Sequence, residues 1–196
     1  MAATLRAFVA IKLADEIINL AAALQDALKS HGLKLRWVKP QSLHLTLKFL
    51  GEIPVTDVTS IGAALRTAAA DEPPLELTVQ GMGVFPGIKR ARVLWIGFGG
   101  AVDRLKQLQL RIEDEIAALG YRREKRGFRA HLTLARIKGA VAPDRLLRAI
   151  EATGGFESQS FEARRLILYK SDLRPTGAVY TPLASVMLQN SVDSGS

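Results

Sequence analysis

The chain has 196 residues, of which 48% are hydrophobic and 23% are charged, so its composition is that of a folded globular protein and not of a disordered one. It contains no cysteine, which excludes disulfides, thiolate nucleophiles and Cys-ligated zinc. The net charge of +8 favours a polyanionic partner such as RNA, DNA or an acidic lipid headgroup. No apolar run approaches the roughly 20 residues that span a bilayer, and no signal-peptide pattern opens the chain, so we expect a cytoplasmic protein without a membrane partner.

The first half of the chain predicts the element order β-α-β-β-α-β. Residues 5–13 alternate as a strand, and residues 14–29 carry apolar side chains at helical spacing. The other elements predicted in this half are strands over 34–39, 43–50 and 75–80 and a helix over 55–70. This order is the split βαβ arrangement of ferredoxin-like units.

The second half repeats this order, with each landmark displaced by the offset that separates His44 from His131. Its predicted elements are strands over 93–98 and around 131 and 166, helices over 102–119 and from 144, and a final strand over 179–188. Residues 121–129 are basic and contain glycine, so we expect a loop there. Residues 81–92 are expected to connect the halves, and residues 189–196 are predicted to be a polar tail.

Two such halves predict an α+β fold with two lobes. Residues 1–188 would form one bilobal domain, with repeat halves over about 5–81 and 92–173 packed side by side around a pseudo-twofold axis. Antiparallel sheets would line a central cleft, with the helices outside, and such a cleft is the usual place for a ligand site. We expect the protein to be a monomer.

Two identical His-Leu-Thr-Leu segments are the strongest functional signal. Residues i and i+2 of a strand share a face, so His44 and Thr46 point one way, as do His131 and Thr133 in the second copy. A single strand histidine is usually an exposed or hydrogen-bonded residue, and we assign His31, which lacks any such pattern, to that class. Because the chain has only three histidines, two at equivalent points of an internal repeat indicate function.

Paired histidines suit acid and base catalysis, because an imidazole with a pKa of about 6.5 exchanges protons at neutral pH. In phosphodiester cleavage, one group takes a proton from the attacking water and the other gives a proton to the departing ribose oxygen. Thr46 and Thr133 can donate hydrogen bonds to the non-bridging phosphate oxygens, where negative charge must be stabilised. This chemistry calls for no metal and no cofactor.

Several segments together resemble a known family. They are Arg36-Trp37-Val38, HLTLKFLG at 44–51, GVFP at 83–86, RVLW at 92–95, FRAHLTLAR at 128–136, and KSDL at 170–173 with Gly177 and Tyr180. Over nearly its whole length the chain resembles the bacterial and archaeal RNA 2′,3′-cyclic phosphodiesterases, also called 2′-5′ RNA ligases, of the two-histidine phosphoesterase superfamily. One departure is Ala130, where the family usually has proline.

The resemblance implies hydrolysis of a terminal 2′,3′-cyclic phosphate to a 2′-phosphate, with RNA ends or cyclic nucleotides as substrates and weak 2′-5′ ligation as the reverse reaction. By position in the motifs, it implies that His44 is the general acid that protonates O3′ and that His131 is the general base that activates water. The near symmetry leaves these roles exchangeable with substrate orientation, and the pair would titrate with macroscopic constants.

Three basic residues are candidates for substrate binding. Arg136 matches a family position that contacts the nucleotide, although strict alternation would place it opposite His131, so a bulge or strand end is required there. Lys48, two residues beyond Thr46, would share its face and add charge to a phosphate pocket. Arg36 would do the same near the cleft.

The segment 121–129 supplies a fourth candidate, Phe128. Its aromatic and basic residues suit contact with an RNA backbone and stacking of a base, although a solvated basic loop is comparably consistent with the composition. Phe85 and Trp95 are expected to lie mainly in the core.

Three alternatives stay open at this point. A metallohydrolase would use both histidines as ligands, but no HExxH pattern or clear third ligand accompanies them. An RNA-binding module with a degenerate site would explain the positive charge but not the intact pair of motifs. A cyclic phosphodiesterase acting on another substrate, such as ADP-ribose cyclic phosphate, would keep the same chemistry.

Overall fold

The computed structural model describes residues 3–175 and 177–189. Its helices are α1 (Asp15–Ser30), α2 (Val58–Ala68), α3 (Val102–Ala118) and α4 (Pro143–Thr153). Its strands are β1 (Thr4–Ile11), β2 (Arg36–Trp37), β3 (Leu45–Pro54), β4 (Leu75–Phe85), β5 (Val93–Gly100), β6 (His131–Arg136), β7 (Gln159–Ala163), β8 (Arg165–Arg174) and β9 (Gly177–Met187). None of these helices is long and apolar enough to cross a membrane.

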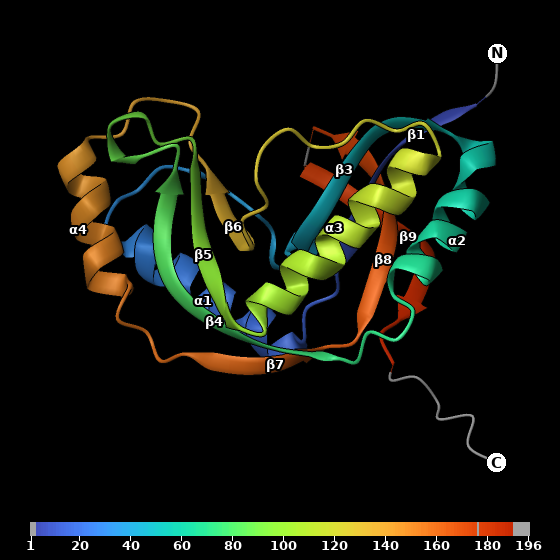
Figure 1. Cartoon of the computed structure of the whole chain (residues 1–196). Coiled ribbons are helices and arrows are strands. Elements are labelled where there is room, and N and C mark those ends of the chain that lie inside the picture. The colour runs from blue at the N-terminus through green and yellow to red at the C-terminus, as the bar shows by residue number, and fades with distance from the viewer. Residues whose placement is uncertain (1–2, 176, 190–196) are drawn as a thin grey trace.

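The strands form two antiparallel sheets. The first sheet has the order β3-β1-β8-β9, and the second sheet has the order β2-β6-β5-β4-β7. Helices α2 and α3 accompany the first sheet, and α1 and α4 accompany the second, which divides the molecule into two lobes (Figure 1). The predicted α+β, bilobal fold class is confirmed.

The two sequence halves are interleaved and do not form one lobe each. Strand β4, from the first half, lies between β5 and β7 in the second sheet, whereas β8, from the second half, lies between β1 and β9 in the first sheet. The long helices are exchanged as well, since α3 packs on β3 and α1 packs beside α4 (Figure 1). The expectation of two halves packed side by side is therefore wrong, because each sheet contains strands of both halves.

Three strands differ from the sequence expectation. Strand β4 continues to Phe85 because a bulge at Gly81, whose φ of 67° favours glycine, carries the ladder through a segment expected to be a connection. Strand β2 is reduced to two residues. Strand β7 was not expected, because it is a short edge strand whose polar residues give little hydrophobic signal. Residues 121–129 contain no helix or strand, as predicted.

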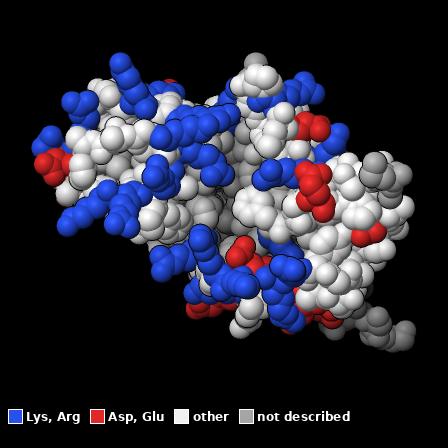
Figure 2. Space-filling model, turned by 90° about the horizontal axis from the view of Figure 1, so that it is seen from above, with Lys and Arg blue, Asp and Glu red and all other residues white. Residues whose placement is uncertain are grey.

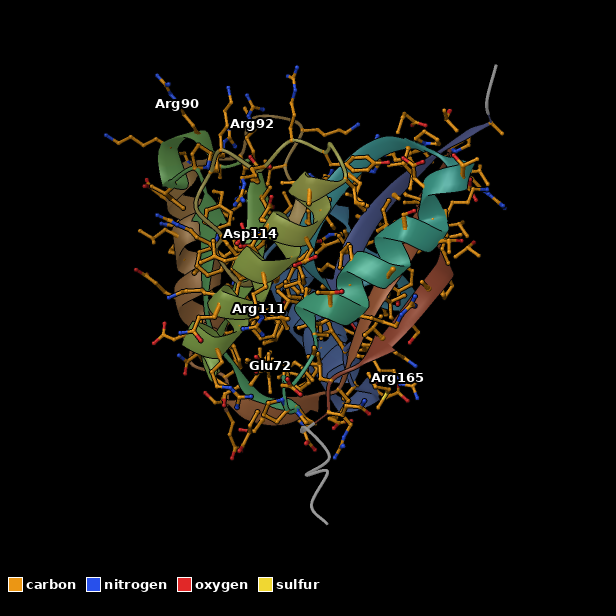
Figure 3. All side chains as sticks on the ribbon, turned by 45° about the vertical axis from the view of Figure 1, so that its right-hand side comes forward. Glu72, Arg90, Arg92, Arg111, Asp114 and Arg165 are labelled. Atoms are coloured by element: carbon orange, nitrogen blue, oxygen red, sulfur yellow. The ribbon has the colours of Figure 1, made fainter. Side chains whose placement is uncertain are left out.

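Helix α3 shows how the sequence pattern builds the core. Its fully buried residues recur every three or four positions and are Leu105, Leu108, Ile112 and Ile116. Burying each such side chain contributes about 1.5–3 kcal/mol. Outside this apolar face, Arg111 of α3 donates to the Glu72 carboxylate at 2.5 Å, which ties α3 to the end of α2 (Figure 3).

Candidate active site

His44 lies immediately before β3, at the end of the 3₁₀ turn Pro40–Ser42. Its Nδ1 is 2.8 Å from the carbonyl oxygen of Ser42. Because a carbonyl can only accept, Nδ1 carries the hydrogen of this bond. The turn therefore fixes the ring and leaves Nε2 as the nitrogen available for proton exchange with a substrate.

His131, the first residue of β6, is held in the same way. Its Nδ1 is 2.8 Å from the carbonyl oxygen of Arg129, again two residues earlier in the chain. The same reasoning assigns the hydrogen to Nδ1 and leaves Nε2 available. In both copies of the motif, Nδ1 of the histidine is held and Nε2 is left available, although the segments that precede them have different sequences.

The surroundings of His44 are aromatic. Its ring centroid lies 4.6 Å from that of Phe8 and 5.0 Å from that of Tyr180, and Tyr180 meets it edge-on. The pKa of His44 is lowered from 6.5 to about 4: burial is the largest cause, the hydrogen bond to Ser42 acts against it and raises the pKa, and the Arg136 guanidinium contributes to the lowering. At neutral pH, His44 of the free protein is therefore an uncharged imidazole.

His131 has fewer aromatic neighbours. Its ring meets Phe85 edge-on at 5.1 Å, and the guanidinium of Arg129 lies 5.9 Å from the centroid of Phe85. The expectation that Phe85 and Trp95 are core residues is wrong, because both are only partly buried and they stack on each other at 5.0 Å beside the second motif. Trp95 lies directly across the β5–β6 ladder from Thr133.

Each motif strand has a bulge at the residue that follows its threonine. Ala10 pairs with Thr46 but Val9 with Lys48, which leaves Leu47 without a partner. In β6 the corresponding unpaired residue is Leu134. A bulge shifts the alternation by one residue, so the side chains beyond it change faces.

The bulge in β6 confirms the irregularity that Arg136 was predicted to require. Beyond Leu134, Arg136 returns to the face of Thr133, and its charge acts on both His44 and Tyr180. Arg36 of β2 lies directly across the ladder from Arg136, and both are exposed. Like charges placed opposite each other are destabilising unless an anion lies between them, so this pair suits a phosphate.

The bulge in β3 overturns the prediction for Lys48. Lys48 pairs with Val9 on the core side of the sheet and is only 3% exposed. Its Nζ donates to Glu113 Oε2 at 2.5 Å and to the carbonyl oxygen of Arg122 at 3.1 Å. Lys48 therefore does not share the face of Thr46, and its charge is neutralised behind the strand.

The remaining predicted residues lie where they can be reached. Thr46 and Thr133 are partly buried, on the same sheet faces as Phe8 and Trp95 respectively. Phe128 is partly buried and packs against the hydrophobic core, so only part of its ring is accessible.

Two buried glutamines each tie one motif strand to a helix. Gln25 of α1 donates to the carbonyl oxygen of Leu134 at 2.8 Å, and Gln109 of α3 donates to that of Leu47 at 3.3 Å. These two carbonyls belong to the bulge residues, which are left unpaired in the β1–β3 and β5–β6 ladders. Strands β3 and β6 approach within 8 Å between Cα atoms, so the two motif strands come together between the lobes. The sequence signal, a glutamine within an apolar helix face, was missed.

Seen from above, the molecule is hollowed between its lobes, and Lys and Arg side chains gather around the hollow (Figure 2). Acidic side chains are sparse on that rim. Within residues 3–175 and 177–189, no three His, Asp or Glu side chains gather in a way that would hold a metal ion.

Comparison with known proteins decides the family. The family model described as LigT like Phosphoesterase matches residues 11–95 and 99–180. The chain belongs to the LigT-like phosphoesterase family. Its relatives include an RNA 2′,3′-cyclic phosphodiesterase of Methanothermobacter thermautotrophicus, 32% identical over 91% of this chain and 96% of the relative. Another, from Thermus thermophilus, is 32% identical over 94% of this chain and 91% of the relative.

Solved structures of LigT-like proteins share the fold. The E. coli LigT structure with 3′-AMP matches with a TM-score of 0.76 and 26% identity over 96% of this chain and all of that one. The protein TT0787 of Thermus thermophilus matches with a TM-score of 0.75 and 25% identity over 95% and 99% of the two chains. The shared fold therefore extends over nearly the whole chain, and the residues matched by the family model include both motif strands.

Proposed function

We propose that this protein hydrolyses the terminal 2′,3′-cyclic phosphate of RNA to a 2′-phosphomonoester by paired histidine acid and base catalysis. The observation that carries the proposal is the matched presentation of His44 and His131, each held through Nδ1 by the carbonyl two residues earlier. Relatives named RNA 2′,3′-cyclic phosphodiesterase, similar over nearly the whole chain, support the substrate class.

The reaction divides between the two histidines. Nε2 of His131 takes a proton from water, whose oxygen attacks phosphorus, and the P–O3′ bond breaks as Nε2 of His44 gives a proton to O3′. Thr46 and Thr133 donate to the non-bridging oxygens. If the 5′-hydroxyl of a second RNA replaces water as the attacking group, the same proton transfers join the two ends through a 2′-5′ bond, which is the weak ligation activity.

With its lowered pKa, His44 can act as the general acid at neutral pH only if the bound substrate raises that pKa. A bound phosphodiester carries a negative charge close to the ring, and an opposite charge favours the protonated imidazole. The same anion offsets the effect of Arg136, which lowers the pKa of His44 in the free protein. His44 then takes up its proton together with the substrate.

The deciding experiment is product identification. A short RNA ending in a 2′,3′-cyclic phosphate is incubated with the protein in excess chelator, and the product is assigned as 2′- or 3′-phosphate by phosphorus NMR. We expect a 2′-phosphate, and ADP-ribose cyclic phosphate serves as the competing substrate. A 3′-phosphate product would contradict the proposal, because it would mean that O2′ and not O3′ is the leaving oxygen. Loss of activity in excess chelator would mean that the reaction needs a metal.

A further inference from the structure

The two motif strands have different neighbours on their outer sides. Beside β6, strand β2 continues the sheet, and the N–H of Val38 extends the pairing to the carbonyl of Leu134. The equivalent segment of the other half, residues 121–129, forms no strand beside β3. It leaves a groove with a volume of about 600 Å³, lined by Lys48, Phe49, Leu50 and residues 120–126.

A buried ion pair holds this loop in place. Glu113 of α3 accepts from Lys48 and from the backbone N–H of Glu124, at 2.5 and 3.2 Å. Lys48 also donates to the carbonyl of Arg122. The loop backbone is thus fixed at two points, and the groove is a built feature of the fold.

The loop wall of the groove is cationic. Arg122, Lys125 and Arg126 are exposed, and none of their side chains has an ion-pair partner within the described residues. Arg123 is different, because it pairs with Asp114 on α3. Glu124 is the carboxylate that lines the groove, and it accepts from the backbone N–H of Arg126 at 3.3 Å. Three unpaired positive charges therefore exceed one negative charge on this wall.

The opposite wall carries an exposed aromatic ring. Phe49 is 61% exposed, and its centroid lies 6.1 Å from that of Phe8, which in turn contacts His44. A ring beside free cations is the combination with which proteins bind single-stranded RNA, by stacking a base and neutralising its phosphate. From Thr46 to Phe49 the strand advances roughly 10 Å, so the groove begins within reach of a phosphate held at Thr46.

We infer that this groove is a subsite for the nucleotide that precedes the cyclic end of an RNA substrate. The inference rests on the proposed function and deepens it, because it makes an RNA chain, and not a free cyclic nucleotide, the preferred substrate. It also orients the substrate. The groove lies on the His44 side, so the ribose and the upstream chain leave on that side, where the acid is required.

The test compares a tetranucleotide ending in a 2′,3′-cyclic phosphate with 2′,3′-cyclic AMP. The variant Arg122→Gln/Lys125→Gln/Arg126→Gln removes the free cations of the groove. Its matched control, Arg66→Gln/Arg145→Gln/Arg148→Gln, removes three exposed cations of α2 and α4, away from the groove. We expect the groove variant to lose about 10-fold or more in kcat/KM for the tetranucleotide at low salt and to keep its rate with cyclic AMP.

Salt dependence gives a second readout. For the wild type, log kcat/KM on the tetranucleotide falls with log salt concentration by about 0.7 for each phosphate contacted, and this slope decreases in the groove variant. Equal losses on both substrates, or no loss on either, would overturn the subsite. If the wild type turns over neither substrate, the proposed function itself has failed. Turnover of cyclic AMP by the variant establishes that it is folded.

Discussion

The two copies of the His-Leu-Thr-Leu motif share their internal geometry and differ in their surroundings. Each holds its histidine through Nδ1, leaving Nε2 available, and each has a bulge after its threonine. Beside β6, however, β2 closes the sheet, whereas beside β3 a basic loop stands away and leaves a groove. The difference teaches that a duplicated motif can keep the same internal geometry while the adjacent segments give its two copies different surroundings.

The electrostatic surroundings differ in the same sense. His44 lies against Phe8 and Tyr180, and burial is the main reason that its pKa falls to about 4. His131 contacts Phe85 and is followed along its strand by the exposed Arg136. A symmetrical pair of motifs therefore acquires one histidine packed among aromatic rings and one with fewer such neighbours, which is a physical basis for separate roles.

The largest expected effect comes from removing either histidine. His44→Ala and His131→Ala should each lower kcat on a cyclic RNA end by about 10²–10⁴-fold. The comparison is sharpened by a substrate in which sulfur replaces O3′, because a thiolate leaves without a proton. This substrate should restore much of the rate of His44→Ala and none of the rate of His131→Ala, as measured by single-turnover kinetics.

His31→Ala is the matched control, because His31 is exposed after α1 and has no place in the motif. Its rate should equal that of the wild type. Rescue of His131→Ala in place of His44→Ala would reverse the roles and the direction of the substrate.

A large effect on stability is expected from the buried ion pair between Lys48 and Glu113. Lys48→Met leaves the buried Glu113 carboxylate without its cation, which should cost about 3–5 kcal/mol in the free energy of unfolding, measured by urea denaturation. Lys48→Met/Glu113→Met should recover most of that loss. Lys106→Met removes an exposed partner of Asp103 and should cost less than about 1 kcal/mol. Equal losses of stability in Lys48→Met and Lys106→Met would mean that the buried pair does not anchor the loop.

A smaller effect is expected on the pH dependence. Since the pKa of His44 is about 4 in the free protein, kcat/KM should rise with pH through about 4, as the doubly protonated form of the pair loses its first proton. Arg136→Ala removes a charge that lowers this pKa, so the acid limb should move to higher pH. Arg36→Ala removes the neighbouring charge, weakens substrate binding and should leave the limb in place. If the acid limb of the pH profile does not move in Arg136→Ala, the charge of Arg136 does not lower the pKa of His44.

Much of the fold was predictable because local patterns reflect it. The helical spacing of apolar residues predicted α1 and α3, and the repeat predicted an α+β molecule with two lobes. Strand exchange was not predictable, since the pattern of β4 is that of a central strand in either sheet. Lys48 was misplaced because alternation was extended through a bulge that has no signature in the sequence Leu-Thr-Leu-Lys. The bulge at Leu134 was anticipated only because Arg136 had to change faces.

By itself, the sequence determined the family resemblance and the hypothesis of paired histidine chemistry, because two His-Leu-Thr-Leu segments stand at equivalent points of a repeat. Only the tertiary structure decided which residues accompany them. It buried Lys48, brought Phe8 and Tyr180 to His44, and left an open groove beside β3. These outcomes depend on contacts between segments far apart in the chain, whereas a sequence pattern reports only the periodicity of each segment.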